Sequence, residues 1–186
     1  MSDMALQFDA FPEPVRGLLQ KYSNEVLPLS RTEKCRRDDA ASIQAQEPPA
    51  LLPGARSPEA AVSGLLLLAG CWDESHKVSQ DIASREGSYW HALAHRIEPD
   101  SANAGWWFGQ VGEHPIFPEL HRRASQALAR HQTPWSLKRA WDPLLFLEWC
   151  DQARLAPGSA LQSAALEIQR AEWDLLFEWC ALPPSA

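Results

Sequence analysis

Apolar side chains recur every three or four residues along most of this chain, and no segment of useful length alternates apolar and polar residues. The first pattern places apolar residues on one face of a helix, whereas a half-buried strand requires alternation. The clearest stripe comprises Trp90, Leu93, Ala94 and Ile97. We therefore predict an all-α fold, a single-domain helical bundle or orthogonal helix array of about six to seven helices.

The 186 residues fit one domain of ordinary size. We expect residues 1–29 to contain an N-terminal helix, because Leu18, Leu19, Tyr22 and Val26 lie at helical spacing. Residues 30–57 mix charged residues with Gln, Ala and Pro and predict a loop or partly disordered linker, which could serve as a lid. Residues 58–182 are expected to form the helical core of the same domain.

Two consecutive helices are predicted at the centre of this core. The first runs from about Ser84 to Glu98, and the second begins at Asp100 or Ser101 as the N-cap. Gly112 is expected to end the second helix in the left-handed conformation. A short link makes such helices antiparallel neighbours, so we expect His114 to lie near the start of the first helix.

Charge and composition argue against two classes of binding partner, nucleic acids and membranes. A net charge of −7 and a pI near 5.3 argue against a nucleic acid, whose phosphates require clustered Lys and Arg. No apolar stretch approaches the roughly 20 residues that cross a bilayer, which predicts a soluble, cytoplasmic protein without a membrane partner. The cysteines contain no CxxC pair and are expected to be reduced; they are Cys35, Cys71, Cys150 and Cys180.

Histidine spacing predicts a metal site. His91 and His95 are four residues apart on the first predicted helix, so both imidazoles can reach one ion. A third ligand could come from His76 or His114. Carboxylate alternatives for this ligand are Asp73, Glu86, Glu98 and Asp100. The expected ion is a divalent metal, zinc or iron or manganese. The competing interpretation is that HxxxH occurs by chance and both histidines are structural.

Other polar residues near the histidines suggest substrate contacts. Asp73 or Asp100 could orient a ligand or act as a base, and Arg96 with Asn103 could position a substrate. Arg96 and Asp100 could equally form a local ion pair. Residues expected to contact a bound small molecule are Gln80, Tyr89, Asn103 and Trp106.

Common catalytic signatures are absent from the sequence: it contains no HEXXH, GxSxG, phosphate-binding glycine loop or dinucleotide fingerprint.

The motifs SH…Q, YWHAxxHR, DxxNAxxWF and VGxHPxF, within about residues 57–181, resemble a family of small uncharacterised bacterial and fungal helical proteins. The resemblance implies that one signature joins His76, Gln80, His91, His95, Arg96, Asp100, Asn103 and His114. It implies no particular reaction.

Two functions follow as hypotheses. The first is a divalent-metal-dependent hydrolase or lyase acting on a small molecule in a histidine-rich pocket. The second is a non-enzymatic module that binds a small ligand or peptide in a tryptophan-lined groove.

Overall fold

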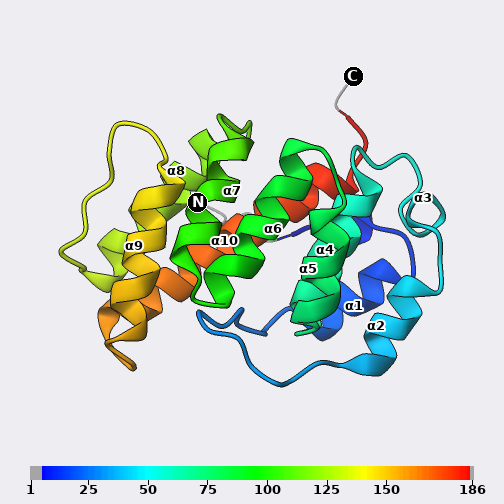
Figure 1. The fold of residues 1–186 in the computed structure, drawn as a ribbon, viewed down its shortest axis with the longest axis horizontal. Helices are drawn as coiled ribbons and strands as arrows, with labels where there is room; N and C mark the ends of the chain where they lie inside the picture. The colour runs from blue at the N-terminus through cyan, green and yellow to red at the C-terminus, as the bar shows by residue number, and fades with distance from the viewer. Residues whose placement is uncertain (1–5, 185–186) are drawn as a thin grey trace.

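The computed structural model describes residues 6–184, and within that range every regular element is a helix (Figure 1). The all-α prediction is confirmed, but six to seven helices is too few, because ten α-helices and one 3-10 helix lie in this part of the chain. The elements are η1 (Phe8–Ala10), α1 (Val15–Lys21), α2 (Arg37–Gln44), α3 (Pro48–Leu51), α4 (Pro58–Leu68), α5 (Trp72–Gln80), α6 (Arg85–Ile97), α7 (Ser101–Val111), α8 (Phe117–His131), α9 (Pro143–Arg154) and α10 (Ala160–Ala181).

The additional helices are mostly short ones in the first third of the chain. The segment expected as a loop, residues 30–57, contains α2 and α3, which bury Ile43 and Leu51 against the core. Helices of eight and four residues offer too few turns for apolar periodicity to show in the sequence. The N-terminal helix α1 is also shorter than predicted, and Val26 lies beyond its end with 58% of its surface exposed.

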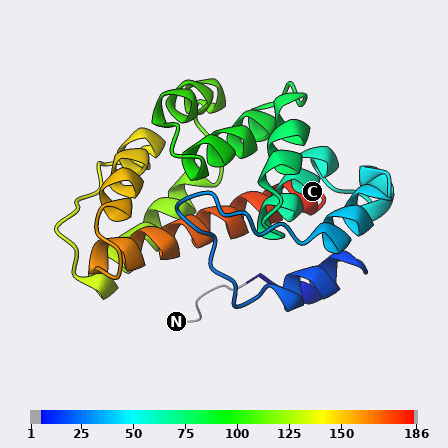
Figure 2. The same cartoon turned by 60° about the horizontal axis from the view of Figure 1, so that its bottom comes forward.

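Helix α10 is the central support of the fold. It runs through the middle of the molecule in both views and packs against α4, α8 and α9 (Figures 1 and 2). One side of α10 buries Ala164, Ile168 and Leu175, and the opposite side buries Trp173 and Phe177. Although α10 has 22 residues, neither it nor any other helix among residues 6–184 is long and apolar enough to cross a membrane.

The predicted boundaries of α6 and α7 are confirmed. The Ser84 hydroxyl accepts a hydrogen bond from the backbone N–H of Gly87 and caps α6, and the Asp100 carboxylate caps α7 by accepting from Asn103. Gly112 ends α7 with φ +61°, a positive value as predicted, but its ψ of −143° lies outside the left-handed helical region. α6 and α7 pack against each other along their length.

A disulfide joins Cys35 to Cys71, just before α5. The prediction that all four cysteines are reduced is therefore wrong for this pair, whereas Cys150 and Cys180 are free, buried thiols. The pair is separated by 36 residues and meets because the segment before α2 packs on the α4–α5 turn, where the Arg36 N–H donates to the carbonyl oxygen of Ala69 at 3.1 Å. Cysteine spacing carries no sign of this packing. A cytoplasmic location stays a prediction.

A buried ion pair joins α6 to α10. Arg96 Nη2 lies 2.5 Å from Glu172 Oε2, and both side chains are 0% exposed. The Tyr89 hydroxyl donates to the other carboxylate oxygen at 2.8 Å, and the guanidinium stacks 4.7 Å from the centre of the Phe146 ring. Burial raises the pKa of Tyr89, which therefore remains a hydrogen-bond donor. Loss of any one of these three side chains would leave another buried polar group without its partner.

Removing one partner of this pair should destabilise the protein strongly. Glu172→Ala leaves the Arg96 guanidinium buried without a counter-charge, which should lower the free energy of unfolding by about 3–5 kcal/mol in chemical denaturation. The double variant Arg96→Met with Glu172→Met removes both charges and should be more stable than Glu172→Ala alone. The control Lys21→Ala breaks an exposed ion pair with Asp39 and should change stability by less than about 1 kcal/mol. An equal effect of Glu172→Ala and Lys21→Ala would contradict this account.

Candidate metal centre

Three histidines from two neighbouring helices converge on one point. α5 contributes His76, and α6, which packs against α5, contributes His91 and His95. His95 Nε2 lies 3.1 Å from His91 Nε2 and 3.3 Å from His76 Nε2. These three predicted ligands form a group that could hold a metal ion, with ligand atoms all within 4.8 Å of one another.

The two nitrogen separations match those of a tetrahedral metal site. Zinc binds imidazole nitrogen at about 2.0–2.1 Å, and the tetrahedral angle then places neighbouring ligand nitrogens roughly 3.3 Å apart. The measured separations of 3.1 and 3.3 Å are close to that value. Two of the three ligand separations therefore already suit a bound ion.

Ser79 can hold the His91 ring in the orientation that metal binding would require. The Ser79 hydroxyl donates to the carbonyl oxygen of Ser75 at 2.9 Å or of His76 at 3.1 Å. Its oxygen can then accept from His91 Nδ1–H, 3.2 Å away. A neutral imidazole carries one proton, so a proton on Nδ1 leaves the Nε2 lone pair free to bind a metal.

Two carboxylates lie behind His95. His95 Nδ1 is 3.3 Å from Glu98 Oε2 and 4.0 Å from Asp100 Oδ2, as ion-pair contacts and not as directed hydrogen bonds. Negative charge on this side favours a proton on Nδ1 and leaves Nε2 facing the other two rings. These groups also form a second, more exposed set of potential ligands, but there His95 would bind through Nδ1.

Indole rings enclose the cluster on two sides. Trp72 stacks on His76 with ring centres 4.7 Å apart, and Trp107 packs on His91 at 4.3 Å. His91 and His95 are 3% and 9% exposed, whereas His76 is only half-buried and provides the side open to solvent. The cluster is thus largely shielded, with access past His76.

The surroundings of His76 and His91 favour the neutral form of these two imidazoles by lowering their pKa values. Burial, and then the neighbouring His76 and His95, lower the pKa of His91 to about 4. Burial and His95 also lower the pKa of His76. Metal binding requires unprotonated nitrogen, so at neutral pH both rings are ready to bind without losing a proton.

His114 is not part of this cluster. As predicted, it lies near the start of α6, where its Nε2 is 3.8 Å from the Glu86 carboxylate. Its ring packs against Tyr89 and Trp179, and its Nδ1 accepts from the Ile116 N–H at 3.4 Å. His114, first among several groups, lowers the pKa of Glu86 to about 2. The start of α6 is more than one turn from His91, so His114 forms a separate structural pair.

The structure assigns structural roles to two residues expected to contact a substrate. Arg96 and Tyr89 are 0% exposed and contact Glu172, so neither the predicted substrate contacts nor the local ion pair of Arg96 with Asp100 is found. Both point to the inside of the bundle, because α6 is buried on every side from Gly87 to Ile97.

The remaining predicted site residues lie at the surface around the cluster. Asp73 pairs with Arg31 at 2.6 Å, and the Asn103 side-chain amide donates to Asp100 at 2.6 Å within the cap of α7. Gln80 is exposed at the end of α5, and Trp106 is 59% exposed beside Trp107. Of these five predicted site residues, Asp100 is the one with an ion-pair contact to the cluster, at 4.0 Å from His95 Nδ1.

Sequence reasoning missed Ser79 and the indoles of Trp72 and Trp107. The sequence held a weak signal for Ser79, which lies three residues after His76 and so shares its side of α5.

Among residues 6–184, one further set of potential metal ligands occurs. It consists of Cys35, Cys71 and Glu74, and its two sulfurs are already joined in the disulfide.

No protein-family model, curated protein or solved structure matches this chain. The resemblance to a family of small bacterial and fungal helical proteins therefore stays a prediction.

The lowered pKa of His91 predicts how the metal-free protein responds to acid. In the unfolded chain His91 titrates near its ordinary pKa of 6.5, whereas in the folded protein it titrates near 4. Between these values the unfolded state binds more protons, so the free energy of unfolding should fall as the pH is lowered from about 6.5 to 4, on the order of 3 kcal/mol. Urea denaturation at several pH values measures this slope, and His91→Gln should reduce it. An unchanged slope would show that His91 is not the responsible group.

Proposed function

We propose that this protein binds one divalent transition-metal ion, zinc in the first place, through His76, His91 and His95. The convergence of three imidazoles carries the proposal, because two of their Nε2 separations, 3.1 and 3.3 Å, are close to those of a tetrahedral site. Low imidazole pKa values and the Ser79 contact support it, because both favour the ligand form of His91.

We further propose that the metal serves a hydrolase or lyase reaction on a small molecule. Structural zinc sites usually have four protein ligands, whereas catalytic sites have three and leave one position to water. The group has three ligands among the described residues, and half-buried His76 offers a solvent side. A bound metal of this type lowers the pKa of its water and makes it a nucleophile at neutral pH.

The chain's own groups would then position and shield the site. Ser79, Glu98 and Asp100 lie on the Nδ1 sides of the imidazoles and would hold the rings in place. Trp72 and Trp107 would exclude water from all but the His76 side.

The alternative, a tryptophan-lined binding groove, has less support. Trp90 and Trp173 are completely buried, and Trp135 stacks on Trp149 within 5.0 Å. Within residues 6–184, Trp106 is the one large aromatic side chain that is exposed. A groove lined by tryptophans requires at least two such side chains facing each other.

Zinc titration of untagged protein tests the metal site directly. Calorimetry should give one equivalent bound, and His91→Ala or His95→Ala should weaken zinc binding by at least 100-fold, since each removes one of three ligands. The control His131→Ala removes an imidazole that pairs with Glu167 at 2.8 Å and should leave zinc affinity unchanged. Wild-type protein that takes up less than about 0.2 equivalents, with no rise in Tm on adding zinc, would refute the proposal.

Two further variants separate ligands from supporting residues. Ser79→Ala should weaken zinc binding by about 10- to 100-fold through loss of the His91 orientation, with the protein still folded by circular dichroism. His114→Gln should alter stability but leave zinc affinity unchanged, because His114 contacts Glu86 and not the cluster. Loss of zinc on His114→Gln would mean that the ligand set is different. Hydrolysis is then sought with small esters, amides and phosphoesters, comparing zinc-loaded wild type with His91→Ala.

A further inference from the structure

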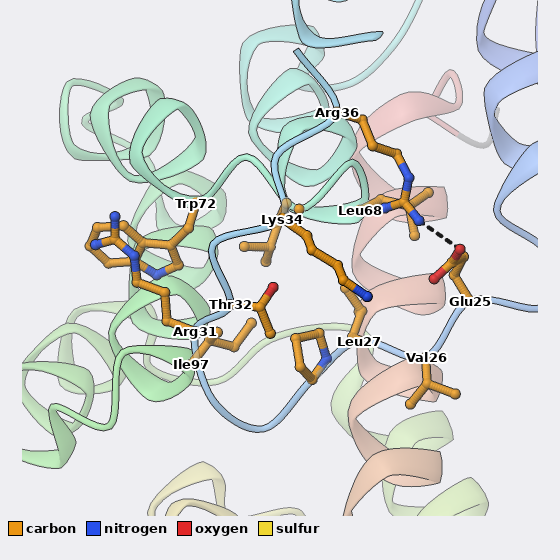
Figure 3. Close-up of a pocket in the computed structure, with 13 residues that line it drawn as sticks. Glu25, Val26, Leu27, Arg31, Thr32, Lys34, Arg36, Leu68, Trp72 and Ile97 are labelled. Atoms are coloured by element: carbon orange, nitrogen blue, oxygen red, sulfur yellow. Dashed lines mark hydrogen bonds and ion pairs between the residues drawn. The ribbon is translucent and has the colours of Figure 1, made fainter. Parts of the chain in front are cut away.

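A small basic cavity lies between residues 25–36 and the ends of α4 and α6 (Figure 3). We refer to it as the Lys34 cavity; its volume is about 250 Å³. The three histidines do not line it, so it is separate from the candidate metal centre.

The charge of this cavity is opposite to that of the protein. Three cations line it, Arg31, Lys34 and Arg36, against one carboxylate, Glu25, whereas the chain as a whole has a net charge of −7. A concave surface lined by charges of one sign concentrates ligands of the opposite sign. The cavity therefore favours an anion.

Lys34 is the cation that has no partner. Arg31 pairs with Asp73, and Arg36 pairs with Glu25 at 2.6 Å. Lys34 makes no hydrogen bond or ion pair with any described residue, and Figure 3 shows its side chain extending between Thr32 and Leu27. Its ammonium has three donors and is free to bind a ligand.

Part of the cavity wall is apolar. Leu27, Leu68 and Ile97 are buried side chains that line it, and Val26 at its edge is 58% exposed. A ligand that fits these walls must carry an apolar body as well as a charged group. An inorganic anion would leave the walls unused.

The backbone around Lys34 is already fixed. On one side the Arg31 N–H donates to the carbonyl oxygen of Ile97 at 2.6 Å, and on the other the Arg36 N–H and the Cys35–Cys71 disulfide fasten the chain to the α4–α5 turn. Gln169 Nε2 donates to the carbonyl oxygens of Leu27 and Pro28. Binding would order little more than the Lys34 side chain, which favours affinity.

We propose that the Lys34 cavity binds a small organic carboxylate with an apolar body. The carboxylate pairs with Lys34 Nζ and accepts a hydrogen bond from the Thr32 hydroxyl, and the apolar body packs on Leu27, Leu68 and Ile97. One carboxylate matches one unpartnered ammonium, because both arginines are neutralised within the protein.

Binding of benzoate and hexanoate to the protein as purified tests this proposal, by calorimetry and by the shift in Tm. Both should bind, and benzamide, which has the same ring without the charge, should bind at least tenfold more weakly. Lys34→Met keeps the apolar stem and removes the ammonium, so it should weaken benzoate binding at least tenfold. The control Lys77→Met removes an exposed lysine of α5 outside the cavity and should bind benzoate as wild type does.

Each contrary result overturns the proposal. Unchanged benzoate affinity in Lys34→Met would place the ligand elsewhere, including at a bound metal ion. Equal binding of benzamide would reduce the cavity to an apolar hollow. Tighter binding of inorganic phosphate than of benzoate would show that the apolar walls contribute nothing, and failure of both carboxylates to bind would leave the cavity without a ligand of this class.

Discussion

Helix α6 is enclosed by other helices, and this burial governs both the stability and the chemistry of the protein. Every residue from Gly87 to Ile97 is buried, yet four of them carry ionisable side chains. Polar groups removed from water must find partners inside the protein. Arg96 obtains a counter-charge from Glu172 on α10, whereas burial lowers the pKa of His91, and His91 and His95 both face His76 on α5.

The Arg96–Glu172 pair and the histidine cluster differ in how far their polar groups find partners within the protein. The Arg96 charge is balanced within the chain by Glu172, whose oxygens also accept from Tyr89, and only the Nε and Nη1 atoms of Arg96 make no hydrogen bond with a described residue. The three histidines lack such a balance. His95 Nε2 lies within 3.3 Å of two other Nε2 atoms, and a single proton cannot form hydrogen bonds between all three nitrogens. If the Nδ1 atoms hold the protons, the Nε2 lone pairs repel one another. A divalent cation bound to the three imidazoles would remove this repulsion, which supports the proposed metal site.

Local signals in the sequence were sufficient for α6, α7 and the His91–His95 pair, because caps, apolar stripes and four-residue spacing are properties of one helix. Arg96 with Glu172, 76 residues apart, and the Cys35–Cys71 disulfide were not predictable, since each depends on how distant segments pack. His114 illustrates the limit within one region. Its position near the start of α6 followed from the antiparallel helix pair, but a helix about 20 Å long has ends too far apart for that position to mean membership of the site.

Trp72 is where the metal centre and the Lys34 cavity meet. Its indole lines the cavity and stacks on His76, and the Arg31 guanidinium lies 4.3 Å from the ring centre. The indole N–H also donates to the carbonyl oxygen of Ala94 on α6 at 2.7 Å, so the ring is held by contacts from three segments. Coupling between two sites requires an element with two arrangements that both ligands bias. A ring fixed in this way has one arrangement, and we therefore expect the two sites to share a wall but to bind their ligands independently.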